Sequence, residues 1–129
     1  MNNKQTTIKD SVSLEGVGIH TGKDVKLTFH PAKENTGYIF KRVDLGDKPE
    51  IEALAKYVVN TQRGTTLEKD GVKLKTTEHV LAALVGLEID NILIEINAEE
   101  PPIMDGSSKF FVDALEKAGL KELSSLRKE

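Results

Sequence analysis

The chain has 129 residues, a length that fits one domain of ordinary size. The residues AVILMFWYC make up 38% of the chain and 10 Gly add to them, which is typical of a globular protein and argues against disorder. The 18 Lys and Arg against 21 Asp and Glu give a net charge of −3, which disfavours nucleic acid as a partner. The absence of Cys excludes disulfides, thiolate nucleophiles and cysteine-ligated metals.

The N-terminal residues lack the apolar run of a secretory signal. The longest apolar stretch, residues 80–87, is far shorter than the roughly 20 residues that span a bilayer. We therefore expect no membrane span and a cytoplasmic protein. Any bound metal must use His, Asp or Glu ligands, and the His residues are His20, His30 and His79.

The first half of the chain predicts short strands. A β-prone stretch at 5–14, a glycine-rich segment at 16–22 and strict apolar–polar alternation at 25–30 together predict a hairpin. Pro31 ends the second strand because proline cannot donate to a strand ladder. Further strands are expected at 38–43 and between 51 and 74, where Asp70-Gly71 predicts a hairpin turn.

Two helices and a core strand are predicted in the second half. Apolar spacing indicates a helix over 76–85, capped by Thr76 or Thr77 and ended by Gly86. The residues expected on its inner side are Val80, Leu81, Leu84 and Val85. The strand 89–96 follows, with Ile92, Ile94 and Ile96 on one face.

The second helix is expected to begin at Ser107 or Ser108 and to end before Gly119. Its expected inner residues are Phe110, Phe111, Ala114, Leu115 and Ala118. The sequence thus predicts about six short strands and two late helices, which favours an α+β two-layer sandwich with a mainly antiparallel sheet and both helices on one face. We expect a domain over 1–120, followed by a charged segment, 121–129, that frays or begins an interdomain linker.

The glycine-rich segment does not match a nucleotide-binding motif. Thr21 stands where the dinucleotide fingerprint needs its third Gly, and Val17 stands where a phosphate-binding loop needs its first. A glycine-rich turn is therefore the simpler interpretation, and His20 is the residue that could give this turn a functional role.

Glu78 and His79 form the most informative pair, because they fall at the start of the predicted helix. In one interpretation His79 ligates a metal ion and Glu78 acts as the base that takes a proton from water. A second His four residues after His79 would complete a common zinc motif, but Ala83 is there, so this helix offers one ligand. The alternative is a capping glutamate beside a surface histidine.

Four segments of the chain, in their order and spacing, resemble the motifs of a known family. They are Gly16–Lys23 (GVGIHTGK), Thr76–Leu84 (TTEHVLAAL), Ile89–Ile92 (IDNI) and Pro102–Ser107 (PIMDGS). From about residue 5 to residue 120 the chain resembles the N-terminal half of UDP-3-O-acyl-N-acetylglucosamine deacetylase, the zinc hydrolase of lipid A synthesis in Gram-negative bacteria.

The resemblance implies two similar α+β domains with the active site between them. It implies that Glu78 is the catalytic base and His79 a Zn²⁺ ligand, and that the remaining zinc ligands and the cations that stabilise the intermediate come from a second domain. It also implies that His20 lies near the site and that Arg63 lies near the substrate entrance, with no role assigned to Arg63. The expected partners are the UDP-linked acylated amino sugar and the missing second domain, and this chain alone is expected to be inactive.

Two other functional classes are weighed against the enzyme. A binding or scaffolding domain of the same fold, without catalysis, is the alternative function. An RNA-binding α+β domain is disfavoured by the net charge of −3 and the lack of a basic face.

Overall fold

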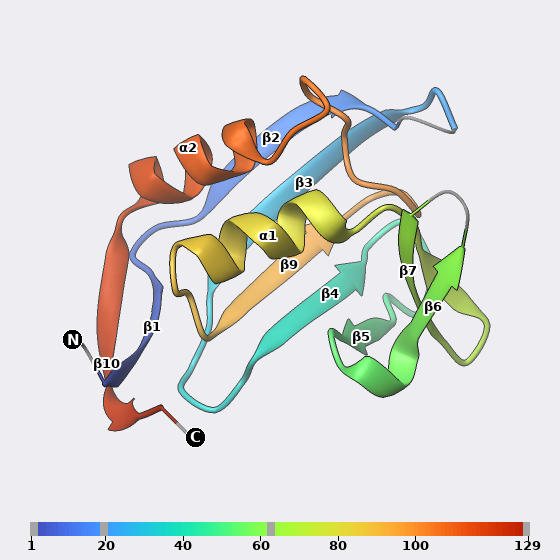
Figure 1. The fold of residues 1–129 in the computed structure, drawn as a ribbon. Helices are drawn as coiled ribbons and strands as arrows, with labels where there is room; N and C mark the ends of the chain where they lie inside the picture. The colour runs from blue at the N-terminus through green and yellow to red at the C-terminus, as the bar shows by residue number, and fades with distance from the viewer. Residues whose placement is uncertain (1–2, 19–20, 62–63, 128–129) are drawn as a thin grey trace.

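The computed structural model describes residues 3–18, 21–61 and 64–127, which form an α+β protein. Its main layer is a five-stranded sheet in the order β2-β3-β9-β4-β5. These strands are β2 (Val12–Val17), β3 (Asp24–Pro31), β9 (Ile92–Ile96), β4 (Tyr38–Arg42) and β5 (Glu50–Glu52). Only β4 and β9 pair in parallel within this sheet. The helices α1 (Glu78–Gly86) and α2 (Lys109–Ala118) lie side by side on one face of it (Figure 1), so the predicted fold class is confirmed.

Two smaller sheets lie at opposite ends of the main sheet (Figure 1). At one end β1 (Lys4–Ile8) pairs antiparallel with β10 (Leu120–Leu126). At the other end a 3₁₀ turn (Ala55–Tyr57) leads into the three-stranded sheet of β6 (Val58–Thr61), β7 (Gly64–Lys69) and β8 (Val72–Leu74). The predicted hairpin turn between β7 and β8 is confirmed, and both Asp70 and Gly71 have positive φ, as a tight turn of the primed type requires.

The core lies between the main sheet and the helices. Residues that alternate along β3 and β9 point inward, and the side chains of Leu27, Phe29 and Ile94 are fully buried. Phe111 of α2 contacts Phe29 edge to face with ring centroids 6.5 Å apart, and Leu84 of α1 is also fully buried. The periodicities of the sequence therefore identified the sheet face correctly.

The expected inner faces of the helices were partly wrong. Val85 is 64% exposed and Phe110 is 42% exposed, while Leu81 is only partly buried. Successive residues on a helix are about 100° apart, so in the pairs Leu84-Val85 and Phe110-Phe111 one residue is buried and its neighbour is exposed. Thr77 and Ser108 precede the helices as expected, but neither side chain caps the helix backbone.

The expectation of a frayed C-terminal segment was wrong for residues 121–126, because they belong to β10. Charged and polar residues hid this strand, since β10 is an edge strand with mostly exposed side chains. Its end is anchored by side chains as well: the Gln5 amide donates to the Leu126 carbonyl at 3.0 Å, and the backbone N of Ser125 donates to the Glu34 carboxylate at 2.7 Å.

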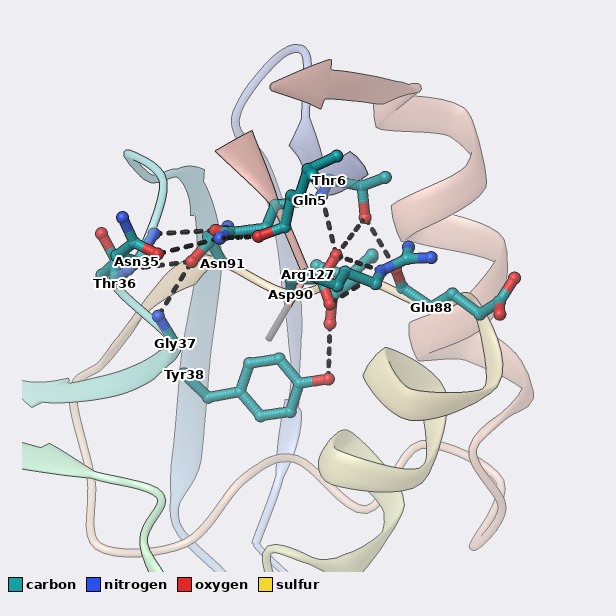
Figure 2. A network of polar contacts seen from close by, with 12 residues as sticks. Gln5, Thr6, Asn35, Thr36, Gly37, Tyr38, Glu88, Asp90, Asn91 and Arg127 are labelled. Atoms are coloured by element: carbon teal, nitrogen blue, oxygen red, sulfur yellow. Dashed lines mark hydrogen bonds and ion pairs between the residues drawn. The ribbon is translucent and has the colours of Figure 1, made fainter. Parts of the chain in front are cut away.

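A polar network fastens this end of the molecule to the loop after α1 (Figure 2). The Arg127 guanidinium lies 2.9 Å from the Asp90 carboxylate, which also accepts the Thr6 backbone N–H at 2.8 Å. The buried Asn91 side chain donates to Gln5 and accepts the backbone N–H groups of residues 36 and 37. The network is distant from the start of α1 and stabilises the fold. Neither described helix is long and apolar enough to cross a bilayer.

Candidate active site at the start of helix α1

The backbone that enters α1 is held on two sides. On one side the Lys75 N–H donates to the Glu99 carbonyl at 2.7 Å. On the other side both the backbone N–H and the hydroxyl of the fully buried Thr77 donate to the Thr65 carbonyl of β7, at 3.0 and 3.2 Å. Thr76, between them, has a φ of +55°, a conformation that a β-branched residue rarely adopts. The first helical residues, Glu78 and His79, therefore project from a constrained turn.

The Glu78 carboxylate lies against the first residues of β7. Its Oε2 accepts a long hydrogen bond from the Thr65 backbone N at 3.4 Å. A Cβ at Gly64 would lie 2.5 Å from the same oxygen, so the glycine leaves the space that the carboxylate occupies. The other oxygen, Oε1, is buried and has no hydrogen-bond partner among the described residues. A buried carboxylate oxygen without a donor is unusual and marks a position where an external donor binds favourably.

His79 is partly buried and lines a cavity of about 60 Å³ beside the same helix start. The other residues around this cavity are Thr76, Val80, Pro101, Pro102, Ile103, Gly106 and Phe111. The walls are mainly apolar, so the imidazole is the principal polar group of this cavity, well suited to a metal or a polar ligand. Glu78 and His79 begin the helix as the sequence predicted, and both are partly buried rather than fully exposed to solvent.

The described part of the chain does not bring together the three protein ligands that a catalytic zinc usually takes. Within residues 3–18, 21–61 and 64–127 no three His, Cys, Asp or Glu residues are grouped so that they could hold a metal ion. His30 lies on β3, where its ring contacts Ser11 and Glu95, so it belongs to a surface polar cluster of that strand. His20 and Arg63 lie outside the described residues.

Two residues at the site escaped the sequence analysis. No local pattern singled out Gly64, whose φ of +122° and close approach to Glu78 make a glycine necessary there. Glu100 is fully buried and accepts hydrogen bonds from Thr21 and Thr76. In the sequence Glu100 directly precedes two prolines, which indicates that it lies in a rigid segment. That pattern does not indicate that its carboxylate is buried.

The family model described as LpxC: UDP-3-O-acyl N-acetylglycosamine deacetylase matches residues 5–129. The chain belongs to this family. The resemblance inferred from the four sequence segments is thereby confirmed. Gly18 and Thr21 of the first segment lie beside Glu100, and Thr76 and His79 of the second line the cavity just described.

Named relatives of the deacetylase family cover nearly all of this chain. It is 54% identical over 118 residues to the bifunctional enzyme LpxC/FabZ of Chlorobaculum tepidum, which is 92% of this chain and 25% of that protein. It is 50% identical over 124 residues to the bifunctional enzyme LpxC/FabZ of Bacteroides thetaiotaomicron, 96% of this chain and 27% of that protein. It is 47% identical over 125 residues to the UDP-3-O-acyl-N-acetylglucosamine deacetylase of Saccharophagus degradans, 97% of this chain and 41% of that protein. The chain therefore spans less than half the length of these relatives.

Proposed function

We propose that this chain supplies the general base and one zinc ligand of a deacetylase that removes the N-acetyl group from UDP-3-O-acyl-N-acetylglucosamine in lipid A biosynthesis. The observation that carries the proposal is the buried, unpartnered Oε1 of Glu78 next to His79. The substrate class follows from membership of the family and from the name of the relative in Saccharophagus degradans.

The residues present fit part of a zinc site. The His79 imidazole is a ligand that zinc commonly takes, and the neighbouring carboxylate has an oxygen available for a proton. Zinc bound there would polarise the amide carbonyl and lower the pKa of water. Catalytic zinc usually has three protein ligands, so we propose that the others come from a second domain that faces this site.

Glu78 is suited to move protons during amide hydrolysis. Its Oε1 accepts a proton from the water that attacks the N-acetyl carbonyl, while the Thr65 N–H holds Oε2. When the C–N bond breaks, the same carboxyl group returns the proton to the leaving amine, so the products are acetate and the free amino sugar. The apolar walls formed by Pro101, Pro102 and Phe111 limit the access of bulk water to His79.

A second domain also fits the surface of the helices. Val85 of α1 and Phe110 of α2 are large apolar side chains with 64% and 42% exposure. A further domain placed over the helices would cover them and would complete the metal site. We keep the proposal of one domain followed by a linker. Because β10 belongs to the fold, the domain extends to residue 126 rather than ending at residue 120.

The test measures release of acetate from UDP-3-O-acyl-N-acetylglucosamine by the complete gene product that contains this chain. Glu78→Gln should lower kcat by about 10²- to 10⁴-fold, as expected for loss of a general base, with little change in zinc content. His79→Ala should lower both the zinc content and the activity. Glu116→Gln, an exposed change on α2, is the matched control and should leave both unchanged.

Two results would reject the proposal in different ways. Full activity of the Glu78→Gln enzyme would show that another residue is the base. A complete gene product that folds and binds the UDP-sugar without releasing acetate would instead favour a binding or scaffolding protein of the same fold.

A further inference from the structure

Glu100 is a fully buried carboxylate in the loop between β9 and α2. Its Oε1 accepts a hydrogen bond from the Thr21 backbone N at 3.3 Å, and its Oε2 accepts one from the Thr76 hydroxyl at 3.1 Å. A buried carboxylate is costly unless hydrogen bonds compensate it, and bonds to a charged acceptor are stronger than those between neutral groups. This side chain therefore joins two segments that are 55 residues apart in sequence, the glycine-rich hairpin and the turn before α1.

The hairpin lies directly on the segment that carries Glu100. A Cβ at Gly18 would lie 2.6 Å from the Glu100 Oε1, so the glycine admits the carboxylate. Gly18 also forms a β-bridge with Pro102, and the Ile103 N–H donates to the Val17 carbonyl at 2.8 Å. The backbone of the hairpin at Val17 and Gly18, which is paired with Pro102 and Ile103, therefore fixes the position of the Glu100 carboxylate.

Thr76 is the strained member of this arrangement. Its φ of +55° is unfavourable for a β-branched residue, and such a conformation persists where the surroundings hold it. The hydrogen bond to Glu100 is the contact that its side chain makes in the described structure. Thr76 also lines the His79 cavity and stands two residues before Glu78, so its conformation sets the direction in which both side chains leave the turn.

We propose that Glu100 is a positioning residue for the deacetylation proposed above, on whose validity this inference rests. Its carboxylate holds Thr76 in the left-handed turn and thereby aims Glu78 and His79, and it fastens the glycine-rich hairpin to the same point. Glu100 acts on these two side chains through its hydrogen bond with Thr76.

The first experiment changes the Thr76 hydroxyl in the complete gene product. Thr76→Val keeps the shape and the backbone strain but removes the hydrogen bond, and it should lower kcat about 10- to 100-fold with KM changed less than about threefold. Thr76→Ser keeps the hydroxyl and should recover kcat to within about threefold of the wild type. Thr7→Val is the matched control, because the buried Thr7 hydroxyl also donates one hydrogen bond, in this case to the backbone carbonyl of Asn91 in the loop after α1. It should leave kcat unchanged.

The second experiment displaces the carboxylate from the hairpin side. Gly18→Ala puts a methyl group 2.6 Å from the Glu100 Oε1 and 2.6 Å from the Thr21 Oγ1, so it disturbs both partners of the hairpin contact and should reproduce the loss of kcat. Gly46→Ala is its control, because a Cβ at Gly46 meets no atom within 4 Å, and it should have no effect.

Amide chemical shifts of this chain provide a readout that is independent of activity. Thr76→Val should shift the amide resonances of Glu78 and His79 clearly more than Thr76→Ser does, and Thr7→Val should leave them unchanged. Unchanged resonances in Thr76→Val, or equal kcat in the Val and Ser variants, would overturn the positioning role. If the wild-type gene product releases no acetate while the resonances respond as expected, the proposed function fails and the contact through Glu100 stands.

Discussion

The space beside Glu78 offers a direct test of the proposed base. Gly64→Ala would add a Cβ only 2.5 Å from Oε2 and 2.8 Å from Oε1 of Glu78, whereas ordinary contacts begin at 3.4 Å. The carboxylate must therefore move by about 1 Å, and a misplacement of that size can reduce catalysis by about 10²-fold. We expect the Gly64→Ala form of the complete gene product to lose about that factor in kcat.

A second glycine separates this displacement from backbone strain. Gly71 also has a positive φ, +82°, and lies in the turn between β7 and β8 of the same sheet, but a Cβ there meets no atom within 4 Å. An alanine at either position is strained by about 1–2 kcal/mol, as for other L-residues in the left-handed region. Both variants should therefore lose stability, and only Gly64→Ala should lose activity beyond its loss of folded protein.

The assay combines urea unfolding with acetate release. The chain has no Trp, so far-UV circular dichroism is the suitable signal for unfolding. Activity is compared in buffer without urea, at a temperature at which both variants are folded. If Gly64→Ala and Gly71→Ala retain equal kcat, the location of the Glu78 carboxylate against β7 does not matter for the reaction and the reasoning is refuted.

Three further predictions concern the core, a titrating tyrosine and the metal. Leu84→Ala should cost about 2–5 kcal/mol in the free energy of unfolding because Leu84 is fully buried, whereas Val85→Ala, at a 64% exposed position, should cost less than about 0.5 kcal/mol; equal values would contradict the observed helix face. Burial, and secondarily the Asp90 charge, raises the pKa of Tyr38 to about 12 from its ordinary value of 10.0, so the folded state favours the neutral phenol. The resulting stability is present below pH 10.0 and is lost as the pH rises through about 12; Tyr38→Phe should remove both this slope and the tyrosinate absorbance change near pH 12. Calorimetric titration of this chain with zinc should show no tight site, since the described residues include no group of three His, Cys, Asp or Glu side chains that could hold a metal ion. Tight binding that His79→Ala abolishes would contradict a zinc site shared with a second domain, and sedimentation with and without zinc would then show whether the ion links two copies of this chain.

The apolar–polar periodicity predicted the main sheet because alternate residues of its central strands are buried. Alternation at 25–29 and 92–96 corresponds to strands whose inner residues, among them Val25 and Ile92, are almost fully buried. The same reasoning failed for β10, because an edge strand can expose most of its side chains and be held by backbone pairing and by contacts such as Gln5 with Leu126. Hydrophobic pattern carries no information about a strand stabilised in this way.

The helix faces show a related limit. A pair such as Phe110-Phe111 gives the same apolar signal at two positions 100° apart, and only contact with the sheet decides between them. Phe111 packs on Phe29 while Phe110 is 42% exposed. An apolar residue on a helix is therefore evidence for the helix but not for its orientation.

The candidate site could be found in sequence only where its residues are adjacent. Glu78 and His79 are consecutive in the sequence, so the pair could be recognised there as a possible base and metal ligand. The groups that constrain them come from other segments of the chain. Gly64 leaves room for the Glu78 carboxylate, and Glu100 bonds Thr76 in a backbone conformation that no local pattern indicates. Burying Glu100 and straining Thr76 both oppose folding, and the hydrogen bond between them offsets part of each cost. Since neither feature improves the core, their coincidence beside the proposed base and metal ligand is best explained by a requirement to fix the direction of those two side chains.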